Sequence, residues 1–225
     1  IHSAFEAGWG GAVWKTLGEP IMNVSPRLAV IDYGNTRMFG LNNIELITDR
    51  PLEVNLKEIR ELKRRWPDRA VIISLMVESK RESWHEMVKM VQDTGCDAFE
   101  LNFGCPHGMS ERGMGAAVGQ VPQYAEMVTA WVKEASQIPV LVKLTPNVTE
   151  VTYIGRAAVR GGADGLSLIN TINSVMSVNL DSFTPNPDVG GESAHGGYCG
   201  PAVKPIALNM VSSLANDTEI GVPIS

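Results

Sequence analysis

The chain has 225 residues, of which 44% are apolar and 20% charged, and its formal net charge is −6. This length and composition are ordinary for one large globular domain with a sizeable core, so we treat residues 1–225 as a single domain. The negative charge argues against a nucleic-acid partner, because phosphate binding needs clustered Lys and Arg. No apolar run reaches the roughly 20 residues that cross a bilayer, so we expect no membrane contact.

The three cysteines are Cys96, Cys105 and Cys199, an odd set with no C-x-x-C pair. This spacing gives no support for a zinc ribbon, an iron–sulfur cluster or thioredoxin chemistry within these residues. Unpaired thiols are typical of a reducing compartment. We therefore expect a cytoplasmic protein whose residues 1–225 hold no metal.

Amphipathic and apolar segments alternate along the first half of the chain. A helix is expected at about residues 4–8, and apolar residues recur at helical spacing over 56–66. The nearly continuous apolar run at 70–76 is typical of a strand buried on both faces of a parallel sheet. A second helical stripe covers residues 84–91 and ends at Gly95.

The same alternation continues in the second half, ending in a long Asn-, Pro- and Gly-rich loop and a final helix. The predicted elements are a strand at 98–102, a helix at about 122–136, a strand at 140–144, a helix from 151 that stops at 161–162, a strand at 165–171, the loop at about 172–200 and the helix at 201–215. Strands and helices at this spacing predict βαβ units and a parallel sheet.

Polar residues that stand out fall at the ends of successive predicted strands, at Lys15, Asn102, Lys143 and Asn170. A (β/α)8 barrel spreads its chemistry over many strand ends on one face, whereas a doubly wound sheet gathers it at one crevice. We therefore predict an α/β fold of the TIM (β/α)8 barrel type. Five strands and the start of a sixth at 222–225 can be recognised. A barrel truncated at both ends, with about strands 2–6 and the start of strand 7, is the expectation.

Lys15 and Lys143 each follow or interrupt a largely apolar segment. Desolvating an ammonium is costly unless an anion or a hydrogen-bond acceptor meets it. Two such lysines at strand ends suit an electron-rich cofactor that becomes anionic on reduction, such as a flavin. The alternative is that each side chain extends along apolar surface and places its charged end in water.

Amide side chains recur near the same strand ends. Asn102 and Asn170 end two strands, Thr171 follows, and Asn43 lies in a short polar run. A carboxamide offers both a donor and an acceptor, which matches the alternating N–H and C=O edge of a pyrimidine or an amide ring. A turn-forming role is the alternative for each asparagine alone. Their common position favours a binding site.

Cys105 and His107 lie on a loop directly after the strand that ends at Asn102. A thiol with an ordinary pKa near about 8.5 is protonated at neutral pH and can act as a general acid. The alternative is a small buried hydrophobe, which suits Cys96 better because Cys96 lies on a helix-to-strand connection. A zinc site at Cys105 and His107 would lack a second pair of ligands.

The glycines from Gly113 to Gly119 look like a dinucleotide-binding loop, but such a loop joins a strand directly to a helix, and here residues 105–112 intervene. We predict instead a mobile active-site segment at about 105–120 that closes over the site. Gly200 precedes the last predicted helix. Backbone N–H groups at a helix start can hold a phosphate, so Gly200 is a candidate phosphate contact.

Together these residues resemble the flavin domain of the dihydropyrimidine dehydrogenase family, within the dihydroorotate dehydrogenase-like FMN barrels. The sequence Cys-Pro-His-Gly-Met followed by Glu-Arg-Gly-Met-Gly is specific to this branch. The matching segments are 7–10 with Lys15 and Thr16, 23–27, 43–46, 101–119, 143–147, 161–165, Asn170 with Thr171, and 197–205.

The resemblance implies FMN-dependent reduction of the 5,6 double bond of uracil and thymine. By this likeness Cys105 would protonate C5 while hydride from reduced FMN reaches C6, and His107 would assist. The likeness assigns FMN contacts to Lys15, Thr16, Lys143 and Gly200, and pyrimidine contacts to Asn43, Asn102, Asn170 and Thr171.

The family's electron path implies further components. Enzymes of this kind draw electrons from NAD(P)H through FAD and [4Fe-4S] clusters, whose motifs are absent from residues 1–225. The resemblance therefore implies a partner subunit or further domains that supply them, and an oligomeric enzyme.

Two departures and two alternatives accompany this interpretation. The family often has Leu-Ser where this chain has Phe103-Gly104, and some relatives have Thr where it has Ile169. The first change removes a hydroxyl contact to substrate, and the second leaves any flavin contact to the backbone. One alternative is a dihydroorotate dehydrogenase, which would need a cation for the substrate carboxylate. The other is an inactive partial barrel that serves only in assembly.

Overall fold

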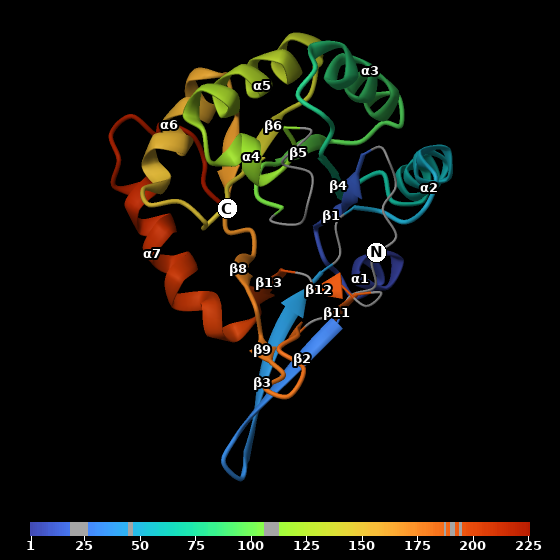
Figure 1. Ribbon diagram of the computed structural model, residues 1–225. Coiled ribbons are helices and arrows are strands. Elements are labelled where there is room, and N and C mark those ends of the chain that lie inside the picture. The colour runs from blue at the N-terminus through green and yellow to red at the C-terminus, as the bar shows by residue number, and fades with distance from the viewer. Residues whose placement is uncertain (19–26, 45–46, 106–112, 187, 190–191, 194) are drawn as a thin grey trace.

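The computed structural model describes residues 1–18, 27–44, 47–105, 113–186, 188–189, 192–193 and 195–225. Its centre is a five-stranded, all-parallel sheet in the order β1-β4-β5-β6-β7. The strands are β1 (Gly11–Leu17), β4 (Ala70–Leu75), β5 (Ala98–Asn102), β6 (Val140–Lys143) and β7 (Gly165–Ser167). Chain order and sheet order agree along these strands, as in a barrel wall (Figure 1).

Helices join the strands and cover one face of the sheet (Figure 1). Most begin and end close to where the sequence predicts. For example, Pro122 opens one helix and Gly161 closes another. The helices are α1 (His2–Glu6), α2 (Leu52–Arg65), α3 (Arg81–Gln92), α4 (Ala116–Gly119), α5 (Pro122–Ala135), α6 (Val151–Arg160), the 3₁₀ turn η2 (Pro201–Val203) and α7 (Lys204–Ala215).

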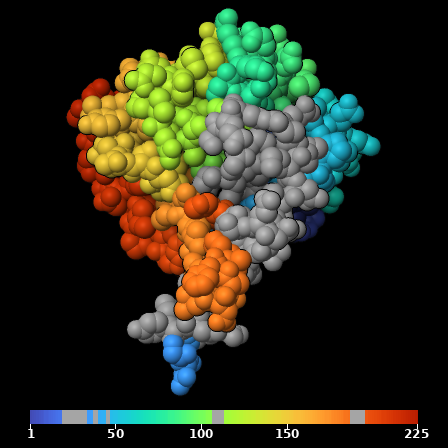
Figure 2. Space-filling model, in the orientation of Figure 1, coloured from blue at the N-terminus to red at the C-terminus, as the bar shows by residue number. Residues whose placement is uncertain are grey.

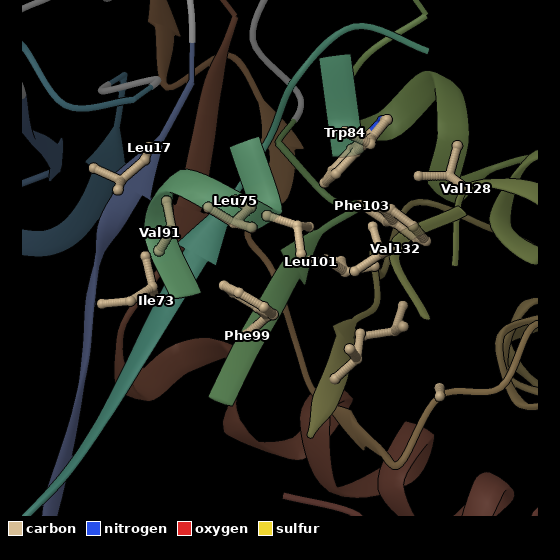
Figure 3. Packing of buried hydrophobic residues seen from close by; sticks show 14 of the residues in the cluster. Leu17, Ile73, Leu75, Trp84, Val91, Phe99, Leu101, Phe103, Val128 and Val132 are labelled. Atoms are coloured by element: carbon tan, nitrogen blue, oxygen red, sulfur yellow. The ribbon is translucent and has the colours of Figure 1, made fainter. Parts of the chain in front are cut away.

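The two faces of the sheet differ in chemistry because side chains alternate along each strand. One face is apolar and packs against the helices, as Ile73, Leu75, Phe99 and Leu101 show; each is fully buried (Figure 3). The other face carries polar side chains near the carboxyl ends of the strands. The outer layer therefore supplies the hydrophobic core, and the inner face is left for chemistry.

A second sheet, four-stranded and antiparallel, has the order β2-β3-β13-β8. Its long hairpin, β2 (Arg27–Tyr33) with β3 (Thr36–Asn43), turns at Gly34-Asn35, and its tip projects from the rest of the molecule (Figure 2). Gly34 has φ +58°, which suits glycine. The sequence patterns considered above do not predict this hairpin.

The connection between β7 and α7 differs from the irregular loop predicted at 172–200. Its described residues form the short strands β8 (Ile172–Ser174), β9 (Ser177–Val178), β10 (Pro185–Asn186), β11 (Asp188–Val189), β12 (Glu192–Ser193) and β13 (Gly196–Cys199). β13 lies between β3 and β8 and so ties this segment to the hairpin. β9 pairs with β10 and β11 with β12, whereas β13 is extended because it pairs with the distant strand β3.

The strand predicted at 165–171 is also shorter, ending at Ser167. The predicted strand start at 222–225 is confirmed in its pairing. Leu166 and Ile224 form a parallel bridge, and the Leu166 N–H donates to the Pro223 carbonyl at 2.9 Å.

Among the described residues, no helix combines the length and apolar character needed to cross a membrane.

Candidate active site

A cavity of about 340 Å³ opens at the carboxyl ends of the parallel strands. This is the end where barrel enzymes carry their chemistry, and the volume falls in the range of about 300–1,000 Å³ for small-molecule sites. The lining residues are Val13, Trp14, Lys15, Thr16, Asn43, Ser74, Glu100, Asn102, Cys105, Lys143, Ile169, Asn170 and Thr171.

A chain of polar side chains crosses this cavity from β1 to the segment after β7. Asn170 Nδ2 donates to Asn102 Oδ1 at 2.7 Å, and Asn102 Nδ2 donates to Thr16 Oγ1 at 3.2 Å. The Thr16 and Ser74 hydroxyls are 2.8 Å apart. Because these strands are adjacent and in register, residues from four separate segments meet at one level of the sheet.

The segment after β7 is held in place by side chains that lie around it. Thr171 N–H donates to Asn170 Oδ1 at 2.8 Å, and Asn147 Nδ2 donates to the Thr171 carbonyl at 3.0 Å. Asn147 Oδ1 also accepts from the Asn173 N–H at 2.9 Å. Asn147 therefore fixes the backbone that presents Asn170 and Thr171, although the sequence patterns did not single it out for this role.

Lys143 shares the cavity with a buried carboxylate. Its Nζ lies 4.0 Å from Glu100 Oε2, and Ser167 Oγ donates to Glu100 Oε1 at 2.9 Å. Glu100 lies two residues before Asn102 on β5, so both point to the same face. Strand alternation counted back from Asn102 was the sequence signal that could have identified Glu100.

Cys105 lines the cavity and is 7% exposed. It also packs in a small buried cluster with Ile47, Met76 and Met114. Cys96 lies elsewhere, and burial raises its pKa to about 11, so that thiol stays protonated and unreactive at neutral pH. Of these two thiols, Cys105 is the one that lines the cavity.

The structure brings together most of the residues predicted for the site. Those on the cavity are Lys15, Thr16, Asn43, Asn102, Cys105, Lys143, Asn170 and Thr171. Gly200 is not among the lining residues; it precedes η2 with φ +88° and lies against Leu41. His107 lies outside the described residues.

The segment predicted to be mobile, about 105–120, is described only in part, since residues 106–112 lie outside the described ranges. Its described end packs onto the site: Met114 and Val118 are buried, and the Ala116 N–H donates to the Cys105 carbonyl at 3.1 Å. Its mobility stays a prediction. Within the described ranges, no three His, Cys, Asp or Glu side chains are grouped to bind a metal ion.

A larger cavity, of about 600 Å³, shares Val13, Trp14 and Lys15 with the first. Its charged side chains include Arg50 and Glu58, which form an exposed ion pair at 2.6 Å. Exposed ion pairs of this kind are well solvated and contribute little energy. The smaller cavity, where amides, a thiol and two lysines converge, is the better candidate.

The fold and the cavity define an α/β protein with a small-molecule site at the carboxyl ends of its parallel strands. The family model described as "Dihydroorotate dehydrogenase" matches residues 15–225. The chain belongs to this family, which confirms the predicted TIM-barrel class, although the five described parallel strands do not close a barrel.

Curated relatives refine the comparison. The chain is 44% identical over 223 residues to "Dihydropyrimidine dehydrogenase (NADP(+)), chloroplastic" of Arabidopsis thaliana, covering 96% of this chain and 52% of the relative. It is 42% identical to "NAD-dependent dihydropyrimidine dehydrogenase subunit PreA" of Escherichia coli (strain K12), covering 99% and 54%.

A third relative belongs to the other branch. The chain is 36% identical to "Dihydroorotate dehydrogenase B (NAD(+)), catalytic subunit" of Pyrococcus abyssi (strain GE5 / Orsay), covering 99% of this chain and 69% of the relative. The two dihydropyrimidine dehydrogenase relatives, at 44% and 42% identity, confirm the predicted resemblance to that family. The chain spans about half the length of the first two relatives.

Proposed function

We propose that this chain is the pyrimidine-reducing part of a dihydropyrimidine dehydrogenase, which adds two hydrogens across the 5,6 double bond of uracil or thymine. The observation that carries the proposal is the convergence of Cys105, the amides of Asn102 and Asn170, and the lysines Lys15 and Lys143 on one cavity. The relatives at 42% and 44% identity bear names of this activity.

The cavity lining fits FMN as the cofactor, which the family also implies. It offers two ammonium groups, the Thr16 hydroxyl and the apolar side chains of Val13 and Trp14, a mixture that suits a flat ring with a polar edge. Lys15, Thr16 and Lys143 would hold the cofactor. When bound, FMN would supply the hydride that C6 of the pyrimidine accepts.

The amides would orient the pyrimidine. Asn102 and Asn170 now bond to each other, and Asn102 also bonds to Thr16. A pyrimidine edge with N–H and C=O groups can replace such bonds one for one, so binding would leave no polar group unpaired. Asn43 and Thr171 lie on the same lining and would complete the contacts.

Cys105 would act as the general acid. Its S–H would give a proton to C5 as the hydride adds to C6, which leaves a thiolate that must be reprotonated before the next turnover. His107 remains a proposed assistant in this proton transfer. Gly200 remains a proposed neighbour of the FMN phosphate, although it is not among the lining residues of the cavity.

The complete enzyme would need more than this chain. We propose that NAD(P)H is oxidised on an FAD- and [4Fe-4S]-containing partner subunit or domain, and that the assembly is an oligomer. One relative is named a subunit, which supports a partner. A cytoplasmic location remains a prediction from cysteine usage, and one relative is named chloroplastic.

The test is Cys105→Ala in the full-length protein, with Cys96→Ala as the matched control. Pyrimidine turnover should fall by about two to four orders of magnitude, the usual range for losing a general acid. Flavin reduction by NAD(P)H should be largely intact, because the thiol acts only in the pyrimidine half-reaction. Stopped-flow absorbance and uracil-dependent steady-state rates separate the two. Unimpaired uracil turnover in Cys105→Ala would rule out the proposed role.

A second candidate function is that of a dihydroorotate dehydrogenase. The matching family model and the Pyrococcus abyssi relative favour it. Parallel assays of the full-length protein with uracil and with dihydroorotate decide between them. Turnover of dihydroorotate without turnover of uracil would select the second candidate. Activity on neither substrate would favour an inactive barrel that serves in assembly.

A further inference from the structure

Glu100 is a buried carboxylate on the cavity, and the proton transfer described above does not use it. It lies on β5, and its side chain is 8% exposed. A buried charge is costly unless other groups compensate it. Two groups do so here: the Ser167 hydroxyl at 2.9 Å and the Lys143 ammonium at 4.0 Å.

Lys143 and Glu100 differ in exposure, and the contact between them is long. The lysine side chain is 34% exposed, so it reaches from the carboxylate toward the open part of the cavity. The separation of 4.0 Å is at the limit of an ion pair, and the second carboxylate oxygen is bonded to Ser167 instead. Lys143 is therefore attracted toward Glu100 while it remains able to bond to a molecule in the cavity.

Register explains why these three groups meet. Lys143 ends β6 and lies directly opposite Ser167 of β7 and Asn102 of β5. Glu100 lies one pleat before Asn102, on the same face. Neighbouring parallel strands thus place a hydroxyl, an ammonium and a carboxylate together below the amides that face the cavity.

We propose that Glu100 is a positioning residue that holds Lys143 at the cavity and sets the reduction potential of the flavin bound there. This inference rests on the proposed FMN function. Reduced flavin carries a negative charge that oxidised flavin lacks, so a nearby carboxylate disfavours the reduced form and an ammonium favours it. With both lysines charged, Glu100 lowers the net charge of these three side chains from +2 to +1.

The test is Glu100→Gln in the full-length protein, which keeps the shape of the side chain and removes its charge. We expect the midpoint potential of FMN to rise, because reduced FMN should bind at least about tenfold more tightly relative to oxidised FMN. A tenfold change equals about 30 mV for a two-electron couple. The measurement is a redox titration of flavin absorbance against a reference dye, together with fluorescence titration of FMN affinity.

Three further variants make the result specific. Glu86→Gln, an exposed position on α3, changes the net charge equally and should leave the potential unchanged. Glu100→Asp keeps the charge and should restore most of the wild-type potential. Ser167→Ala removes one bond to the carboxylate and should shift the potential by a small but measurable amount, so it tests the idea even where Glu100→Gln fails to fold.

The outcomes separate this inference from the proposed function. A wild-type protein that holds no FMN refutes the proposed function itself. FMN bound with an unchanged or lowered potential in Glu100→Gln overturns only the role of Glu100. Should Glu100→Gln not fold, an unchanged potential in Ser167→Ala overturns it.

Discussion

Asn102 is the residue at which the polar groups of the cavity are joined. Its Oδ1 accepts from Asn170 Nδ2 at 2.7 Å and from the Gly104 N–H at 3.2 Å, while its Nδ2 donates to Thr16 at 3.2 Å. The side chain is buried, so water cannot replace these partners readily. One carboxamide thus orients another amide, a hydroxyl and the start of the loop that carries Cys105.

Asn102→Ala should raise the KM for the pyrimidine by about ten- to hundredfold. Without this amide, the polar groups of the bound pyrimidine that it would contact are buried without a partner, at a cost of about 1–3 kcal/mol. Steady-state kinetics with uracil measure the change, and Asn209→Ala on exposed α7 is the matched control. An unaltered KM in Asn102→Ala would show that the amide does not contact the substrate.

At the scale of elements, β13 is shaped to fit the side chains that it covers. Gly197 lies against the Thr171 side chain so closely that a methyl group at its Cα would overlap the hydroxyl and the Cβ of that residue. Gly196 has the same relation to Asn42. A strand normally avoids glycine, and here the missing side chains leave room for those of Thr171 and Asn42.

Gly197→Ala should therefore displace Thr171 and lower kcat/KM for the pyrimidine by at least about tenfold. Overpacking of this kind typically costs about 1–3 kcal/mol, so Tm should fall as well. Gly221→Ala is the matched control, because a methyl group there would meet no atom within 4 Å. Equal kcat/KM values for the two variants would contradict the proposed contact of Thr171 with substrate.

The parallel strands and the helices between them could be predicted because their patterns are local. The apolar run at 70–76 and the stripe through Leu56, Ile59 and Leu62 have the periods of a buried strand and an amphipathic helix. The hairpin of β2 and β3 had a signal too, since Gly34-Asn35 between two extended runs favours a two-residue turn. The two-residue strands after β8 had none: β9 pairs with β10 and β11 with β12, but two residues are too few to show an alternating pattern.

The candidate site was predictable to a similar degree. Asn102 and Lys143 stand out because polar side chains interrupt apolar strands at their ends. Glu100 and Ser74 did not stand out, since a polar residue inside a strand reads as an ordinary solvent-facing position. Alternation from Asn102 places Glu100 on the cavity face, and the register between β4 and β5 sets Ser74 directly opposite it.

At the scale of the molecule, ion pairs connect the helices that surround the sheet. Arg160 of α6 pairs with Glu126 of α5, and Arg156 pairs with Asp217 and Glu219 after α7. The Arg156 Nε–Asp217 Oδ2 distance is 2.8 Å. The Glu219 backbone N–H and the Arg156 guanidinium lower the pKa of the Asp217 carboxyl below its usual 3.8.

Asp217→Asn should lower Tm at pH 7 and have a diminishing effect in acid. A carboxyl with a depressed pKa stabilises the folded state above its unfolded pKa, and that contribution is lost as pH falls through the lower folded value. The Tm difference from wild type should therefore be full above about pH 5 and shrink below the usual value of 3.8. Differential scanning calorimetry at several pH values tests this.

The control for that series is Asp181→Asn, which removes an exposed carboxylate on the β9–β10 hairpin. It should change Tm little at any pH. A Tm difference for Asp217→Asn that stays constant from pH 7 to pH 3 would show that the ion pair is not its source.

The alternation of β5 limits how this segment can change during evolution. Phe99 and Leu101 pack in the hydrophobic core between sheet and helices, whereas Glu100 and Asn102 line the cavity. Deleting or inserting a single residue here would exchange the two sets, placing aromatic and aliphatic groups in the cavity and charge among the helices. Length variation among homologues should therefore be confined to the connecting loops, or occur within β5 only in steps of two.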